Sequence, residues 1–337
     1  MSVRTEPDVV RVAREFKAAL LRAELAEQYL MAERYLRVET ALTDSIAALA
    51  EHVAGLRAAG REPSLGMLYR LERWQSLERQ ILAELTSFNG WAAERIASRQ
   101  RALGRSGIEY ARGTLQASDL AVPFDALPTA AVEAMVGLAG DGSPLSALLV
   151  KAYPDVHEAI ADALVRGVAI GQNPAKVAAG MRDALGVGLD RAFLIARTEE
   201  LRAFRTAAQD TYREAGVTQY RRMATLDEAT CIGCLAADGE ISDNDEVFDA
   251  HPACRCTMVP IVGEELTWRS SEDWFNAQDH ETQVAIMGPG RLEAYESGAA
   301  SWSDMFMRTD DATWGGAIVP TPLSDLVPGG MPGAKAA

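Results

Sequence analysis

Five potential metal ligands lie close together between positions 231 and 256. All four cysteines of the chain fall in this stretch, together with one of its four histidines. Two residues separate the first pair of cysteines, sixteen more precede the histidine, and His-x2-Cys-x-Cys follows. A reducing cytoplasm keeps thiols free, so clustered cysteines there indicate metal binding before disulfides. The candidate ligands are Cys231, Cys234, His251, Cys254 and Cys256.

The cluster predicts a structural zinc site that uses four of these five residues. A Cys-x2-Cys turn brings two thiolates to one tetrahedral ion, and a second pair closes the site. If Cys254 and Cys256 lie on an extended segment, their side chains share one face and Arg255 points to the other. That arrangement favours four cysteines with His251 outside the ligand set; three cysteines with His251 is the alternative. Zinc would hold together a loop with few apolar residues, and disulfides or free thiols are the competing interpretation.

Catalytic motifs are missing from the sequence. His157-Glu158 and His280-Glu281 begin like the zinc-protease motif, but Ala161 and Val284 stand where the second histidine is required. None of the four histidines starts the His-x-Glu of nucleobase deaminases, and there is no Gly-rich phosphate loop. We therefore predict that the chain is not an enzyme. The alternative is a zinc-knuckle nuclease of the His-Asn-His type, although only His251 lies near the cluster.

Two long helices are expected before the cluster. From Val9 to Leu56 apolar residues recur at helical spacing, ending in the four-three rhythm of a coiled coil. A break at 58–66 precedes a second apolar run from Leu68 to Phe88, which continues less regularly past Ile96. Residues 1–117 are thus predicted to form a helical hairpin or stalk, through which copies of the chain could associate.

The middle of the chain predicts a linker region followed by a helical unit. Residues 118–152 are interrupted by prolines and glycines. Residues 153–216 carry three expected helices: one begins at Pro154, a short one covers 175–185, and the third runs from Asp190 as N-cap to Ala215, with Gly216 after it.

A mixed region is expected after residue 216. Residues 217–310 are predicted to form one domain, in which short strands at 218–226 and 257–262 flank the cluster and helices cover 271–287 and 291–295. The Gly-, Pro- and Ala-rich residues 311–337 are predicted to be a flexible tail. The fold class is therefore α+β, mainly α, with a small β-rich zinc-knuckle insert.

The negative charge is concentrated near the cluster. The formal net charge is -15, and residues 227–311 contain 4 Lys or Arg against 19 Asp or Glu, whereas residues 1–117 contain 17 against 15. An acidic region of this kind repels phosphate backbones, so sequence-specific nucleic-acid binding is not expected. No stretch is apolar enough for a membrane span, and the first residues do not resemble a signal peptide.

Several ordered motifs together resemble the phage Mu F-like minor head protein family, also called the phage head morphogenesis family. The resemblance covers roughly residues 150–310, and its order is more specific than any single motif. The matching residues are Ala196-Arg197-Thr198-Glu199, Leu226 to Cys234, Asp238-Gly239, His251 to Cys256, and the downstream Trp274, Gln278, Gln283, Gly288, Arg291, Tyr295 and Gly298.

The resemblance implies a structural role in the virion. Members of this family are minor proteins of the capsid interior, associated with the portal vertex and needed for head assembly or DNA delivery. Expected partners are the portal protein and capsid or scaffold proteins, with the host cytoplasm as the place of assembly. The resemblance also implies that Arg197 and Glu199 form a buried polar contact that holds their helix against the β insert. Asp238-Gly239 is interpreted as a turn.

Overall fold

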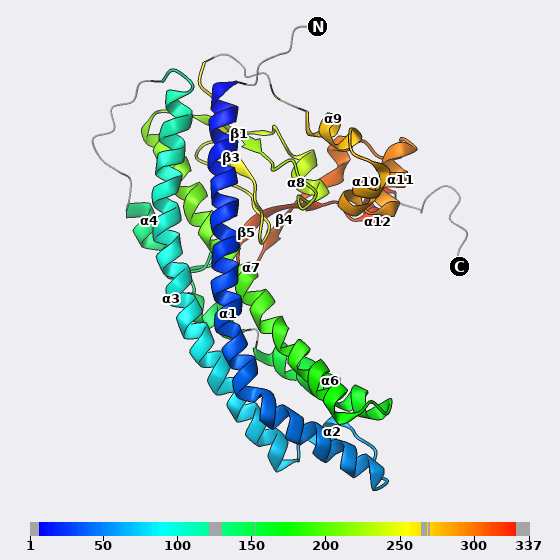
Figure 1. Cartoon of the computed structure of the whole chain (residues 1–337). Coiled ribbons are helices and arrows are strands. Elements are labelled where there is room, and N and C mark those ends of the chain that lie inside the picture. The colour runs from blue at the N-terminus through cyan, green and yellow to red at the C-terminus, as the bar shows by residue number, and fades with distance from the viewer. Residues whose placement is uncertain (1–6, 121–129, 152, 264–267, 269, 328–337) are drawn as a thin grey trace. The chain divides into compact units, whose positions relative to one another are not determined.

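The chain is mostly helical, with two small antiparallel sheets (Figure 1). The computed structural model describes residues 7–120, 130–151, 153–263, 268 and 270–327 of the 337. The predicted α+β class with a predominance of helix is confirmed. Among the described residues, no helix is long and apolar enough to cross a membrane.

Two compact units, each built from segments that are not contiguous in sequence, make up the chain. Unit 1 comprises residues 1–19, 99–136 and 198–337, and unit 2 comprises residues 20–98 and 137–197. Three long helices contribute residues to both units: α1 (Asp8–Ala58), α3 (Glu72–Gln116) and α7 (Pro174–Glu214).

In unit 2, α1 and α3 form the predicted antiparallel hairpin. They are joined through the short helix α2 (Leu65–Leu68), which Ser64 caps by accepting a hydrogen bond from the backbone of Met67. Three residue pairs join the two helices, and as the residue number rises in α1 it falls in α3, so the helices are antiparallel. The pairs are Glu27 with Arg95, Tyr35 with Phe88, and Ser45 with Gln80.

Helix α7 is continuous where two helices were expected. The prediction of separate helices at 175–185 and 190–215 is wrong, and Asp190 lies inside the helix instead of capping it. Within α7, Gly188 lies against Tyr35: a Cβ there would lie 2.7 Å from the Tyr35 hydroxyl. That hydroxyl donates a 2.5 Å hydrogen bond to the carbonyl of Leu185. Helix α6 (Tyr153–Ala169) precedes α7, as predicted, and buries Ile160 and Leu164.

In unit 1, a three-stranded antiparallel sheet has the order β2-β1-β3. Its strands are β1 (Gln219–Met223), β2 (Ile241–Asp243) and β3 (Thr257–Pro260). Gly216 ends the preceding helix with φ +75°, as expected for a left-handed cap. The predicted strands on both sides of the cluster are therefore present, and the short helix α8 (Ile232–Ala236) lies between β1 and β2.

The helix expected over 271–287 is two helices. These are α9 (Ser271–Asn276) and α10 (His280–Met287), followed by α11 (Pro289–Glu296). Asp279 separates the first two because its side chain accepts a 2.8 Å hydrogen bond from the backbone of Thr282 and so starts a new helix.

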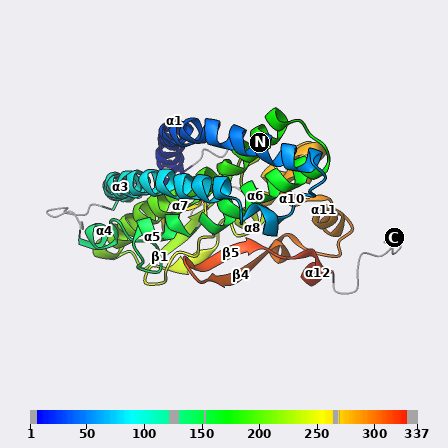
Figure 2. The ribbon, with the colours of Figure 1, turned by 90° about the horizontal axis from the view of Figure 1, so that it is seen from below.

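A β-hairpin lies where much of the flexible tail was predicted. After the turn η1 (Trp302–Met305), strand β4 (Phe306–Asp311) pairs with β5 (Gly315–Pro320), and α12 (Leu323–Leu326) follows (Figure 2). The glycines of β5 are untypical of a strand, but β5 buries Ala317 and Ile318. Residues 328–337 of the predicted tail lie outside the described residues.

The predicted linker region contains two short helices. They are α4 (Ala130–Met135) in unit 1 and α5 (Leu145–Val150) in unit 2. Residues 121–129 and 152 of this region lie outside the described part of the chain.

Candidate metal centre

The Cys-x2-Cys pair is held at the first turn of α8. Cys231 is the N-cap of this helix in an extended conformation, and its sulfur accepts a hydrogen bond from the backbone N–H of Cys234 at 3.4 Å. The helix thus fixes the spacing of the two sulfurs. The other three candidate ligands lie on the loop that leads into β3, where Ala253 reverses the backbone with φ +60°.

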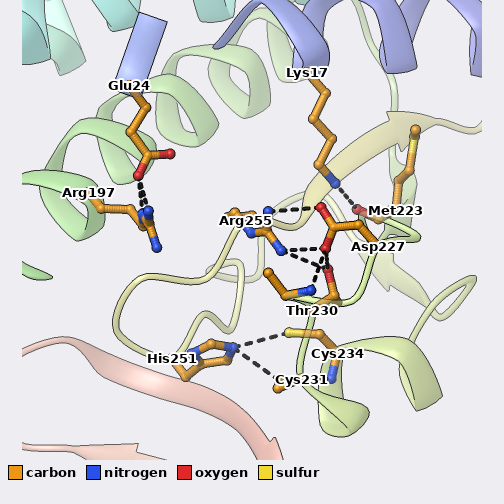
Figure 3. A network of polar contacts seen from close by, with 11 residues as sticks. Lys17, Glu24, Arg197, Met223, Asp227, Thr230, Cys231, Cys234, His251 and Arg255 are labelled. Carbon is orange, nitrogen blue, oxygen red and sulfur yellow. Dashed lines mark hydrogen bonds and ion pairs between the residues drawn. The ribbon is translucent and has the colours of Figure 1, made fainter. Parts of the chain in front are cut away.

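The structure brings all five predicted ligands together. The ring nitrogen Nε2 of His251 lies 3.4 Å from Cys231 Sγ and 3.2 Å from Cys234 Sγ (Figure 3). Cys234 Sγ lies 3.7 Å from Cys254 Sγ. All four cysteines are free thiols. The ligand atoms form two groups that share Cys234, each with its atoms within 4.8 Å of one another. One group adds Cys231 and His251; the other adds Cys254 and Cys256.

Neighbouring groups shift the pKa values of the cluster residues in different directions. A hydrogen bond from Cys234, reinforced by His251, lowers the pKa of Cys231 to about 5, whereas that same bond with Cys231 raises the pKa of Cys234. Burial works against protonation of His251, but hydrogen bonding to Cys231 and the neighbouring thiolates raise its pKa to about 9. A soft divalent ion that binds here would displace thiol protons, because the thiolate is the metal ligand.

Side chains of α7 form hydrogen bonds with the backbone of the loop that carries Cys254 and Cys256. The hydroxyl of Thr198 accepts a 2.9 Å hydrogen bond from the backbone of Ala253, and Arg205 donates to the carbonyls of Cys254 and Cys256 at 3.0 and 3.2 Å. Residues 198 and 205 are seven apart, so they lie on one face of the helix. These contacts fix the backbone of the ligand loop.

The polar contact expected for Arg197 and Glu199 is divided between different partners. Arg197 pairs with Glu24 of α1, not with the β insert. Glu199 is fully buried, accepts a 2.7 Å bond from Arg202, and accepts a 2.9 Å bond from the indole of Trp314 in the β4–β5 turn. Within this run, Thr198 makes the direct contact with the ligand loop.

Arg255 points away from the cluster, as the alternation of an extended segment predicts. Its guanidinium binds both carboxylate oxygens of Asp227 at 2.5 and 2.9 Å and donates to the hydroxyl of Thr230 at 3.2 Å (Figure 3). Cys254 and Cys256 on either side of it point into the cluster. A bidentate pair thereby ties the β3 side of the site to the segment before Cys231.

The predicted turn at Asp238-Gly239 is present and has a further role. Gly239 has φ +85°, and a Cβ there would lie 3.1 Å from the ring of Trp268. The carboxylate of Asp238 accepts hydrogen bonds from the backbone of Ala224 at 2.6 Å and from the Trp268 indole at 3.1 Å. Asp238 therefore closes the end of β1 against the turn.

Sequence patterns did not identify Lys17 and Arg205. Lys17 is buried and donates a 3.1 Å hydrogen bond to the carbonyl of Met223, 206 positions away (Figure 3). No local signal marks it, because a basic residue in an amphipathic helix is normally solvated. Arg205 also carries no local signal, because the carbonyls that it contacts lie about 50 residues further along the chain.

The donor set fits zinc. Thiolates and an imidazole at mutual distances of 3.2 to 3.7 Å are the ligands of structural zinc sites, and the second ring nitrogen of His251 lies 2.7 Å from the Pro252 carbonyl, which orients the ring. Of the four histidines, all of them described, only His251 belongs to these groups.

One comparison with known proteins supports the family resemblance over part of its length. Residues 158–259 match the family model described as phage Mu protein F like protein. No curated protein and no solved structure matches the chain. The matched range contains α7, the three-stranded sheet except for its final residue, and all five candidate ligands. Residues 158–259 of this chain are therefore similar to the phage Mu protein F like family.

Proposed function

We propose that the chain is a structural minor head protein that acts in phage head morphogenesis, without enzymatic activity. The observation that carries this proposal is the family match over residues 158–259, which includes the complete cysteine and histidine cluster. The proposed place of action is the capsid interior at the portal vertex, in head assembly or DNA delivery. The proposed partners are the portal protein and capsid or scaffold proteins.

Crosslinking within procapsids tests this proposal. Mass spectrometry of purified procapsids and virions should detect the chain at low copy number, with crosslinks to the portal protein. A phage from which the gene for this chain has been deleted should assemble fewer correctly formed heads or should fail to deliver its DNA. Absence of the chain from both procapsids and virions would refute the proposal.

The proposed role of the cluster is to hold one zinc ion that fastens the β-rich part of unit 1. Four of the five candidate ligands would bind it, and their thiolates would supply the affinity. Such a site can stabilise a small module by on the order of 10 kcal/mol. Metal analysis of protein purified under reducing conditions should give one zinc per chain, and a Cys234→Ser, Cys254→Ser double variant should give none.

Self-association through the N-terminal helices is the remaining part of the proposal. Leu25, Tyr29 and Leu36 of α1 are 58%, 77% and 57% exposed and follow helical spacing, so they form an apolar row that can pack against another helix. Sedimentation of the wild type should show oligomers that a Tyr29→Lys variant shifts towards monomer. Equal sedimentation of the two proteins would remove this part of the proposal.

A further inference from the structure

A pocket in unit 1 is lined by α7, by the loop between β2 and β3 and by the β4–β5 turn. Helix α7 contributes one face to it, because Arg202, Arg205 and Thr206 follow helical spacing. Phe248 of the loop and Trp314 of the turn provide aromatic walls. All five residues belong to unit 1, so the pocket forms within one compact unit.

The pocket has room for the end of one side chain. Water can occupy about 70 Å³ of it. One water molecule needs about 10 to 15 Å³ on this measure, so the pocket holds several waters. A side chain that enters from outside would displace these waters into bulk solvent.

Arg205 presents one edge of its guanidinium group to the pocket. The side chain is 5% exposed, and its Nη1 atom donates to the carbonyls of Cys254 and Cys256 at 3.0 and 3.2 Å. Within the described residues, Nε and Nη2 of Arg205 make no hydrogen bond, yet neither atom is fully enclosed. Because Arg205 lines the pocket, these two nitrogens are open to it.

The open edge has a specific donor geometry. The N–H of Nε and one N–H of Nη2 point the same way from the planar guanidinium group. Such a fork binds both oxygens of a carboxylate through two parallel hydrogen bonds. A neutral amide offers a single oxygen and leaves one of the two donors unsatisfied. The fork therefore favours a carboxylate over an amide.

Carboxylates of the chain itself do not occupy this fork. In the part of the chain that the structure describes, Arg205 forms no ion pair. Glu199 is bound by Arg202 and by the indole of Trp314, so Arg202, the other cation of the pocket, is already matched. The acidic Asp249 pairs with Arg308.

The surrounding charge favours a ligand with a single negative charge. Residues 227–311, which supply part of the pocket, contain 4 Lys or Arg against 19 Asp or Glu. This excess repels a phosphate group more strongly than a carboxylate, because the phosphate carries more negative charge. One open guanidinium edge matches one carboxylate.

An apolar surface adjoins the fork. Val247 lines the pocket and is 81% exposed, and the ring centre of Phe248 lies 5.4 Å from Cζ of Arg205. Protein interfaces commonly combine an arginine in a pocket with aromatic and apolar contacts around it. A peptide whose acidic side chain enters the pocket would contact Val247 with the residues beside it.

We propose that this pocket binds the carboxylate of an acidic side chain on a peptide segment of a partner protein, with Arg205 as the recognising residue. The Nε and Nη2 atoms of Arg205 hold both carboxylate oxygens. Phe248, Trp314 and Val247 contact the stem of the side chain and its neighbours. The inference goes beyond the proposed function and involves neither the cluster sulfurs nor a bound ion.

NMR titration of the isotope-labelled full-length chain tests the class of ligand. The probes are N-acetyl-glutamate N-methylamide, its glutamine counterpart and inorganic phosphate, at equal ionic strength. The glutamate probe should shift the Nε–H signal of Arg205 with a dissociation constant of about 1 mM, as expected for a ligand of about 14 non-hydrogen atoms. The glutamine probe should bind about tenfold more weakly, because it lacks the charge and the second acceptor.

Variants test the place of binding. Val247→Lys should strengthen and Val247→Glu should weaken binding of the glutamate probe by about two- to fivefold, because these exposed charges act through solvent. Ile170→Glu, at a position that is 69% exposed in unit 2, is the matched control and should bind as the wild type does. Arg205→Lys keeps the charge but loses the fork, so it should bind about tenfold more weakly.

Three results would overturn the proposal. Equal binding of the glutamate and glutamine probes would show that the pocket does not recognise a carboxylate. Tighter binding of phosphate than of the glutamate probe would make this a phosphate site. If Arg205→Lys does not unfold cooperatively, the two Val247 variants decide the matter, and unchanged affinity in both would place the binding elsewhere.

Discussion

Gly188 lies against the hydroxyl group of Tyr35 inside unit 2, so this position cannot accept a side chain without rearrangement. Tyr35 is fully buried, and its hydroxyl is fixed by the hydrogen bond to Leu185. A buried ring with a fixed hydroxyl cannot move aside cheaply, because protein interiors are close-packed.

We predict that Gly188→Ala lowers the free energy of unfolding by about 1 to 3 kcal/mol, as overpacking does. Gly186→Ala is the matched control: a Cβ there meets nothing within 4 Å, so helix propensity should raise stability by about 0.5 to 1 kcal/mol. Urea unfolding measures both. In a Tyr35→Phe background the cost of Gly188→Ala should fall, and an unchanged cost would contradict the proposed clash.

Asp238 is a carboxylate held in a place that favours its protonated form. Burial raises its pKa to about 6 and exceeds the opposing effect of its hydrogen bonds from Ala224 and Trp268. A carboxyl group whose folded pKa is raised stabilises the fold fully below the unfolded pKa. That contribution is lost as the pH rises through about 6.

We therefore expect metal-free wild type to lose stability relative to Asp238→Asn as the pH rises from about 4 to about 7. The relative change should be on the order of 2 kcal/mol, since one pKa unit corresponds to about 1.4 kcal/mol. Urea unfolding of both proteins with a chelator present measures it. A stability difference that is constant with pH would show that Asp238 titrates normally.

Helix α8 and strand β5 approach each other closely at Gly233, the residue before Cys234. A Cβ at this position would lie 2.7 Å from the backbone nitrogen of Pro320 and 2.7 Å from the carbonyl carbon of Val319. Neither group can rotate away, because both belong to the backbone of the β4–β5 hairpin. The helix that carries the first two cysteines thus depends on a hairpin about 85 residues further along the chain.

Gly233→Ala should reduce the free energy of unfolding by about 2 to 3 kcal/mol, although alanine is the better helix former. It should also weaken zinc binding, because α8 positions Cys231 and Cys234. Chemical unfolding and zinc competition measure the two effects. Gly180→Ala, which meets nothing within 4 Å, is the control, and equal behaviour of the two variants would contradict the close approach.

Elements with strong local patterns were predicted well, and those defined by distant contacts were not. The apolar period from Val9 to Leu56 gave α1 nearly to its ends. The division of α7 was predicted wrongly, because Asp190 was interpreted as an N-cap although it lies inside the continuous helix. The β4–β5 hairpin was missed since neither the polar β4 nor the β5 sequence that begins with two glycines shows the apolar alternation of ordinary strands.

Removal of the proposed zinc ion should loosen unit 1 selectively. The contacts described for the cluster come from residues of unit 1, including Lys17, Thr198 and Arg205. Unit 2 has its own core, in which α6 buries Ile160 and Leu164. The metal is thus expected to stabilise one part of the chain more than the other.

Hydrogen exchange followed by mass spectrometry tests this expectation. A chelator should accelerate exchange in β1, in β3 and across residues 231–256, and leave α6 unchanged. The mechanism is local opening, because the ligand loop loses its fastening. Equal acceleration in α6 would mean that the metal stabilises both units together.

The sequence alone established the five candidate ligands, the helices α1 and α3 and the resemblance to the Mu F-like family, because each depends on residue types at short, fixed spacings. Only the tertiary structure showed the contacts between residues that are distant in sequence. The burial of Lys17 against Met223, the packing of Gly233 on β5 and the division of contacts among Arg197, Thr198 and Glu199 join residues that are far apart in the chain. Such contacts leave no local pattern, since close packing and charge compensation act between surfaces that meet only after the chain has folded.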